Sequence, residues 1–154
     1  MASLGGMHVG DDLKWSRASF RIFGETLQPE EIGVALGIAA TRSHLKGELR
    51  DARHTAVWRE SAWLLRSPLA RGTDLAEHLK WLLEAIESKT DVIAELSKKY
   101  RIDFFCGFSS GNGQGGFALD SDILRRIANF GIPLNLDLYP PAIESDDIDS
   151  DGNN

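Results

Sequence analysis

The chain has 154 residues, of which 42% are hydrophobic and 26% charged, a balance typical of one globular domain and not of a disordered or fibrous protein. Its formal net charge is -6, but residues 142–154 hold five acidic side chains and no basic one. The rest of the chain is therefore nearly neutral. This argues against the broad basic field that binding to a nucleic-acid backbone requires, although local basic patches remain possible.

Cysteine content and the N-terminal sequence predict where the protein resides. Cys106 is the only cysteine, which excludes an intramolecular disulfide or a multi-cysteine metal site and is typical of a reducing compartment. Residues 1–15 contain no basic segment followed by an apolar run, and no stretch approaches the length of a transmembrane helix. We therefore expect a cytoplasmic protein that does not span a membrane.

The first half of the folded region predicts a strand, a helix and a second strand. Residues 18–22 alternate between apolar and polar types, as in a strand with one buried face. A proline and two glutamates open residues 29–36, which predict a short helix that stops at the following glycine. The apolar run over residues 61–66 predicts another strand.

The second half repeats these signals. Leucines and isoleucines recur at three-and-four spacing over residues 74–99, and the interruption at Lys89 leaves open one long kinked helix or two packed ones. Alternation predicts strands over residues 102–108 and 134–138, and a short strand over 115–119. Between the last two, a helix begins near Asp120 or Ser121 and ends at Gly131.

Together these elements predict an α+β fold. We expect a single domain over residues 16–141, with a mixed or antiparallel sheet of five to six strands and helices packed mainly on one face. Residues 1–15 are expected to form a flexible segment, and residues 142–154 an acidic disordered tail. Strand order is not fixed by periodicity.

A glycine-rich loop invites a comparison with nucleotide-binding motifs. Gly111, Gly113 and Gly116 satisfy the spacing of a dinucleotide fingerprint, and Asp137 lies where a ribose-binding acid would be expected. In that fingerprint, however, the loop opens directly into a helix, whereas the strand predicted over residues 115–119 intervenes here. A phosphate-binding loop would also need a lysine and a hydroxyl residue after the last glycine. We interpret the loop as a hairpin connection.

Metal and nucleophile chemistry have little support in the sequence. The acidic tail copies the opening of a calcium loop, but the required glutamate at position twelve would fall beyond the last residue. The four histidines lack converging partners, so we expect no metal and no cofactor, and we place His78 on the solvated side of its helix. Cys106 lies among strand phenylalanines and is interpreted as a packed hydrophobic residue and not as a catalytic thiolate.

Two regions are candidates for recognition. Residues 41–54 form a locally cationic segment that includes Arg42, His44 and Lys46 and is either a solvated loop or a contact for an acidic partner or phosphorylated ligand. In the strands, Phe105 and Tyr139 fall with charged residues on the face opposite the apolar one. Aromatic residues among charges are typical of recognition surfaces, but a helix packed there would bury them equally well.

The sequence also resembles a known family. The segments ASFRIFG, PEEIGVALGI, TRSHLKGE, SAWLLRS, DLAEHLKWLLEAIESK and GQGGFALDSDILRRIANFGIPLNLDLY occur in the order found in the bacterial domain of unknown function 4279. The similarity covers residues 18–139. It implies a small cytoplasmic bacterial α+β protein and no established reaction, so it transfers no functional residue.

These observations favour a non-enzymatic protein-binding module that acts as immunity proteins do, by neutralising a toxin. The alternative is a small-ligand or phosphate-binding sensor in which the glycine loop and the loop of Lys46 converge on an anion. An enzyme ranks third and would need a carboxylate such as Asp103 or Asp137 close to another such group or to a histidine. The candidate binding residues are Arg42, His44, Lys46, Phe105, Tyr139, Gly113, Gly115 and Gly116.

Overall fold

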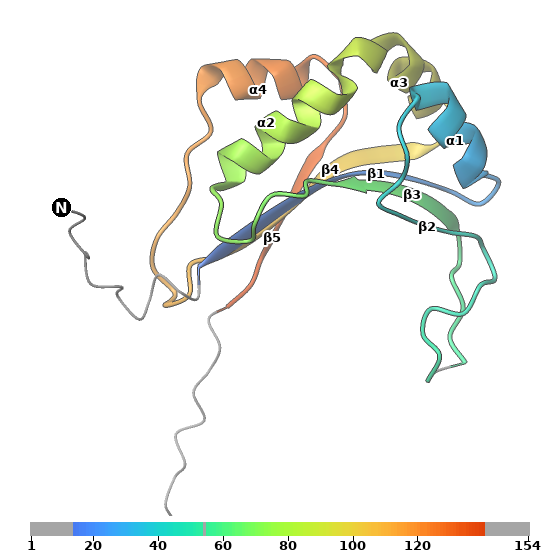
Figure 1. The fold of residues 1–154 in the computed structure, drawn as a ribbon, viewed down its shortest axis with the longest axis horizontal. Coiled ribbons are helices and arrows are strands. Elements are labelled where there is room, and N and C mark those ends of the chain that lie inside the picture. Colours follow the sequence, from blue (N-terminus) through green and yellow to red (C-terminus); the bar gives the residue numbers. More distant parts are fainter. Residues whose placement is uncertain (1–13, 54, 141–154) are drawn as a thin grey trace, which may run out of the picture.

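The computed structural model describes residues 14–53 and 55–140, and contains one five-stranded sheet with its helices on one side (Figure 1). The strand order is β2-β3-β1-β4-β5, in which only β4 and β5 run parallel. The strands are β1 (Trp15–Gly24), β2 (Arg42–His44), β3 (Ser61–Arg66), β4 (Arg101–Ser109) and β5 (Leu134–Leu138). The predicted α+β fold is confirmed. The predicted acidic tail and most of the N-terminal segment lie outside the described residues.

The helices follow from their apolar stripes. They are α1 (Pro29–Leu36), α2 (Leu75–Ile86), α3 (Thr90–Ser97) and α4 (Ser121–Ala128), with a 3-10 turn, η1 (Glu87–Lys89), between α2 and α3. The region predicted as one helix or two is therefore two, and the break lies at the turn that contains Lys89. None of the helices within the described residues is long and apolar enough to cross a membrane.

The core lies between the sheet and these helices. Phe20 on β1, Trp63 on β3 and Phe104 on β4 are almost fully buried, and the ring of Phe20 makes edge contacts with both others, with ring centroids 6.3 and 5.7 Å apart. The leucine stripe of α2 packs on this aromatic layer. Burial of side chains of this size contributes about 1.5–3 kcal/mol each, so this layer fixes which face of every central strand is turned inward.

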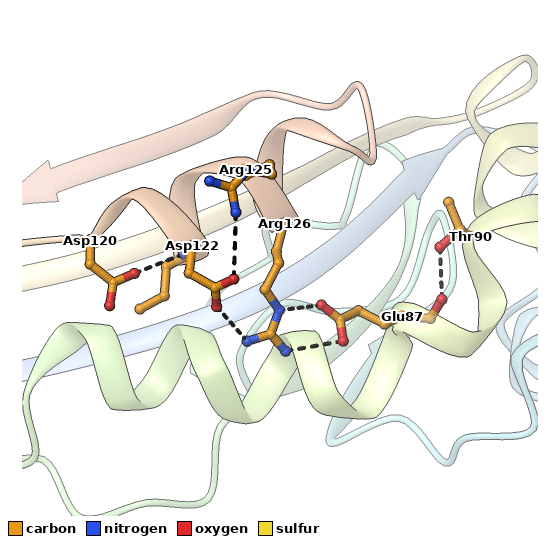
Figure 2. A network of polar contacts seen from close by, with 7 residues as sticks. Glu87, Thr90, Asp120, Asp122, Arg125 and Arg126 are labelled. Atoms are coloured by element: carbon orange, nitrogen blue, oxygen red, sulfur yellow. Dashed lines mark hydrogen bonds and ion pairs between the residues drawn. The ribbon is translucent and has the colours of Figure 1, made fainter.

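Helix α4 is held in place by polar contacts at both ends (Figure 2). The Asp120 carboxylate accepts a hydrogen bond of 2.9 Å from the backbone N–H of Ile123, which confirms the predicted start of this helix. Near the other end, the Arg126 guanidinium pairs with both carboxylate oxygens of Glu87 in η1, and it also reaches Asp122. Glu87 and Asp122 raise the pKa of Arg126, because both carboxylates stabilise the charged guanidinium.

Two predictions about local structure were wrong. Residues 115–119 form no strand, and the glycine-rich segment is not a hairpin, because it connects β4 directly to α4 through irregular backbone. Conversely, the segment predicted as an exposed loop contains β2, which pairs with β3 through Arg42–His44. Glycines at positive φ explain the first difference, since Gly111, Gly113 and Gly115 all adopt conformations that do not continue a strand.

Candidate binding surface

One face of the sheet carries no helix, and we call it the open face (Figure 1). Alternation and pairing register together determine its residues, because side chains of directly paired residues point to the same side. Strand β1 contributes Trp15, Arg17, Arg21 and Phe23, while its core side chains point to the helices. The rest of the open face is formed by Arg42, His44, Leu64, Arg66, Arg101, Asp103, Phe105, Asn135, Asp137 and Tyr139.

The centre of the open face is a neutralised arginine. Arg21 lies directly opposite Asp103 in the β1–β4 register and donates two hydrogen bonds of 2.8 and 2.7 Å to its carboxylate. The Asn135 side-chain amide donates another, of 2.7 Å, to the same carboxylate. The guanidinium lies 4.0 Å from the ring centroid of Phe105 and 4.9 Å from that of Phe23. This cluster therefore joins β1, β4 and β5 across the face.

A second arginine crosses the sheet because a glycine leaves room for it. Arg17 is paired with Gly107, and a Cβ placed on that glycine would lie 3.0 Å from Arg17 Nε. The arginine therefore reaches over β4, and its Nη2 donates a hydrogen bond of 2.8 Å to the hydroxyl of Tyr139 beyond β5. Its guanidinium lies over the rings of Tyr139 and Trp15, whose centroids are 4.8 Å apart.

Four arginines at the open face form what we call the arginine group: Arg17, Arg42 and Arg66 belong to its strands, and Arg71, which follows β3, contacts Trp15. Partial burial lowers the pKa of Arg66, and the charges of the other three lower it further. Among the residues that the structure describes, none of these four arginines forms an ion pair. The group therefore presents positive charge that the described part of the protein does not neutralise.

An aromatic stack borders the arginine group on the side of β2. The imidazole of His44 stacks on Trp58 with ring centroids 3.7 Å apart and an angle of 10° between the planes, and the guanidinium of Arg50 lies 4.6 Å from the Trp58 centroid. Burial lowers the pKa of His44, with a further contribution from the charge of Arg42, so the ring is neutral at physiological pH. Arg42, Arg50 and Trp58 help to line a hollow of about 400 Å³.

A separate pocket lies where β3 ends and the chain turns toward α2. We call it the rim pocket; it has a volume of about 190 Å³ and is lined by Ser16, Arg17, Arg66, Ser67, Leu69, Arg71 and His78. The prediction that His78 is solvated was wrong, because only 1% of its surface is exposed. Its Nδ1 lies 2.8 Å from Ser67 Oγ, and its buried Nε2 has no hydrogen-bond partner. Burial lowers the pKa of this imidazole, a shift opposed by the backbone of Ala70 and Thr73.

The structure brings together only part of the predicted site. Arg42, His44, Phe105 and Tyr139 share the open face, as their strand positions require. Lys46 does not join them, since its Nζ lies 3.6 Å from Glu25 and its backbone N–H donates to Ser61, beside the Gly24 end of β1.

The predicted glycines lie at the opposite end of that strand. Gly113 and Gly115 line a hollow of about 390 Å³ with Tyr139, and Gly116 lines a neighbouring one of about 260 Å³. This loop follows Ser109, which pairs with Trp15 at the start of β1. The predicted convergence of the glycine loop with Lys46 is therefore wrong, because ten residues of extended strand separate the two.

The described histidines are not placed for acid–base catalysis with a carboxylate. Asp103 is paired with Arg21 and Asn135, while His44 and His78 contact Trp58 and Ser67 respectively, so neither of these two histidines is hydrogen-bonded to a carboxylate. Within the same residues, no group of three histidine, cysteine or acidic side chains is placed to hold a metal ion. Burial raises the pKa of the Cys106 thiol to about 12, which confirms its interpretation as a packed residue.

Several residues of this surface escaped the sequence analysis. Arg17 lay just outside the strand predicted from residue 18, although the alternation extends back to Trp15. Arg66 and Arg71 lie at and beyond the end of a strand and carry no periodic signal of their own. Their proximity to Arg17 depends on the pairing of β1 with β3 and on the hydrogen bond from the Ser16 N–H to the Arg71 carbonyl.

Comparison with known proteins gives a family and no further match. Residues 14–141, which contain every strand and helix described above, match the family model for the domain of unknown function 4279 (DUF4279). The chain belongs to the DUF4279 family. No curated protein and no solved structure matches it. Membership in DUF4279 confirms the resemblance recognised from the sequence and assigns no reaction, ligand or partner, so the function has to be argued from the open face itself.

Proposed function

We propose that this DUF4279 protein is a non-enzymatic cytoplasmic binding module whose open face binds an acidic surface of a partner protein, as an immunity protein binds a toxin. The proposal rests on the arginine group: Arg17, Arg42 and Arg66 lie on the open face, Arg71 contacts Trp15 beside them, and none forms an ion pair among the described residues. Mutual repulsion of these charges disfavours the free protein and is relieved when carboxylates approach, so an acidic partner is the occupant that this face favours.

The aromatic side chains of the same face support this reading. Trp15, Trp58 and Tyr139 are only partly buried, and each lies beneath an arginine guanidinium. Arginine, tryptophan and tyrosine are the residues most enriched at the energetic centres of protein interfaces. Their rings fix the guanidinium groups in place before binding, which reduces the entropy lost when a partner docks.

The distribution of charge favours a protein over a nucleic acid. Arg42, Arg66 and Arg71 lie toward β3, whereas the β4–β5 side of the open face carries Asp137. A phosphate backbone presents negative charge throughout and would meet this carboxylate unfavourably. A protein surface can match both halves with side chains of opposite sign, which is the usual basis of specificity at protein interfaces.

The experiment compares two variants with equal changes in charge. Arg42→Glu/Arg66→Glu reverses two exposed cations of the arginine group, and Lys80→Glu/Lys99→Glu reverses two exposed cations outside it. The tagged wild-type protein and both variants are used for quantitative affinity capture from the native lysate. We expect one stoichiometric protein to be captured by the wild type and by the lysine variant but not by the arginine variant.

The captured protein is then purified and tested directly. We expect a dissociation constant that weakens with added salt and, when the partner is produced alone in cells, toxicity that the wild-type module relieves and the arginine variant does not. Capture of the same partner by both variants would place the interface elsewhere. A partner that is harmless alone would leave protein binding in place and remove the immunity role.

A further inference from the structure

The charged side chains that line the rim pocket are all arginines. Arg66 lines it from the end of β3 and Arg71 from the connection to α2, whereas the guanidinium of Arg17, another lining residue, extends away over β4 to Tyr139. The remaining lining residues are two serines, a leucine and His78, and none is acidic. Two arginines with up to five N–H donors each therefore line a small volume that contains no counter-charge from the lining residues.

The inner wall of the pocket is polar and fixed. His78 is buried against Ser67, and its second ring nitrogen makes no hydrogen bond of ordinary geometry, although the backbone of Ala70 and Thr73 lies close enough to oppose the lowering of its pKa. The hydroxyl of Ser67 and the imidazole line the pocket together with Arg66 and Arg71 and make this wall polar.

The size of the pocket limits the ligand. A volume of about 190 Å³ is smaller than the range of about 300–1,000 Å³ that is typical of sites for drug-sized molecules. It is large enough for one tetrahedral oxyanion with a few waters, each of which occupies about 30 Å³. Arginine binds such anions in bidentate geometry, which makes a cluster of arginines a typical site for phosphate.

The surroundings of the pocket indicate what the phosphate could be attached to. Trp15 is a neighbour of the lining residues, because both Arg17 and Arg71 contact its ring, with guanidinium carbons 5.3 and 4.7 Å from the centroid. Tyr139 packs against Trp15 and connects this region to the hollow lined by Gly113 and Gly115. A group extending from a bound phosphate would meet these aromatic side chains.

We propose that the rim pocket binds a phosphate group, free or as the terminal group of a small phosphorylated molecule, through Arg66 and Arg71. This site differs from the predicted convergence of the glycine loop with Lys46. Its two arginines also belong to the arginine group, but phosphate binding can be measured without a partner protein. The lowered pKa of Arg66 agrees with it, because a dianion would relieve the repulsion between Arg66 and the neighbouring cations.

The test measures binding to the full-length protein by calorimetry, with inorganic phosphate and phenyl phosphate as probes and sodium chloride at matched ionic strength as the blank. Two or three charge-assisted hydrogen bonds predict a dissociation constant between about 10 µM and 1 mM. Tighter binding of phenyl phosphate would indicate a phosphorylated molecule that contacts Trp15 and Tyr139. Equal binding of both probes would indicate the free anion.

The variants assign the binding to this pocket. Arg66→Gln/Arg71→Gln removes two exposed pocket cations, and Arg42→Gln/Arg50→Gln removes two cations of the open face outside the pocket. We expect the first to weaken phosphate binding roughly 10- to 100-fold and the second to change it less than about threefold. In the wild type, nuclear magnetic resonance signals of Ser67 and His78 should shift on saturation. Absence of heat with either probe, or equal affinity in both variants, would overturn the proposal.

Discussion

Arg21 and Arg66 lie on the same face of the same sheet, yet their surroundings differ in one decisive respect. Arg21 is paired in register with Asp103, whereas Arg66 is paired with Ser19, and Arg17 with Gly107. Pairing with an acid turns the first arginine into part of the scaffold. The absence of an opposing acid leaves the others with charge available to a ligand. In this sheet, the residue opposite each arginine therefore decides whether it holds the fold together or serves for binding.

The largest expected effect tests the scaffold arginine. Asp103→Ala leaves the Arg21 guanidinium and the Asn135 amide without their common acceptor in a mostly buried position. Breaking a buried pair costs about 3–5 kcal/mol, and since the side chain of Arg21 is 22% exposed we expect the free energy of unfolding to fall by about 2–3 kcal/mol. Urea denaturation measures the change.

The matched variant is Arg66→Ala, which removes an exposed arginine of the same face without a paired acid. It should change the free energy of unfolding by less than about 0.5 kcal/mol, as for most surface substitutions. Similar losses in both variants would mean that the two arginines do not differ in structural role.

The second test concerns the glycine that gives Arg17 its path. Gly107→Val adds atoms where a Cβ alone would lie 3.0 Å from Arg17 Nε and 3.1 Å from the Trp15 ring. Displacement of these side chains should lower the free energy of unfolding by about 1–2 kcal/mol, as is usual for overpacking. Gly107→Ala should show a smaller loss of stability, and unaltered stability in Gly107→Val would show that Arg17 needs no such path.

The fold was largely predictable because its strands bury one face each. Alternation located β1, β4 and β5, and an apolar run located β3. Strand β2 has three residues, too few for a period, and it exists because β3 offers a free edge. The sequence also contained the signal for His78, which lies three residues after Leu75 and four before Leu82 and therefore on the buried stripe of α2. Because histidine is polar, the sequence analysis placed this residue on the solvated side of the helix.

The candidate site was less predictable than the fold, for a physical reason. The alternation of apolar and polar residues along a strand indicates which face of the sheet each residue occupies, and it correctly placed Phe105 and Tyr139 on the same face. It does not state which strands are neighbours, and the rim pocket depends on β1 lying between β3 and β4. Arg17 is distant in sequence from Arg66 and Arg71 and lines the same pocket only through that order.

The third test concerns the hydrogen bond that Arg17 donates to the hydroxyl of Tyr139. Tyr139→Phe removes the hydroxyl that accepts from Arg17 Nη2 but retains the ring that packs on Trp15. One hydrogen bond to a charged group in a partly exposed position predicts a loss of about 0.5–1.5 kcal/mol in the free energy of unfolding. Thermal and urea denaturation both report it. A loss as large as that of Asp103→Ala would mean that Arg17 belongs to the scaffold with Arg21.

The smallest expected effect is a pH dependence of stability that comes from His78. Burial lowers the pKa of its imidazole below the ordinary value of 6.5, so in the acid range the unfolded chain takes up a proton that the folded protein does not. Stability should therefore decrease as the pH falls through about 6.5, until the pH lies below the folded pKa.

Because burial lowers the pKa of His44 in the same direction, the measurement compares the wild type with His78→Gln, which keeps a polar group near Ser67 but does not titrate. Urea denaturation at about pH 7.5 and about pH 5.5 should show a smaller acid-induced loss in the variant. Equal losses in both proteins would mean that His78 takes up its proton as easily in the folded protein as in the unfolded chain, and that the wall of the rim pocket is open to water.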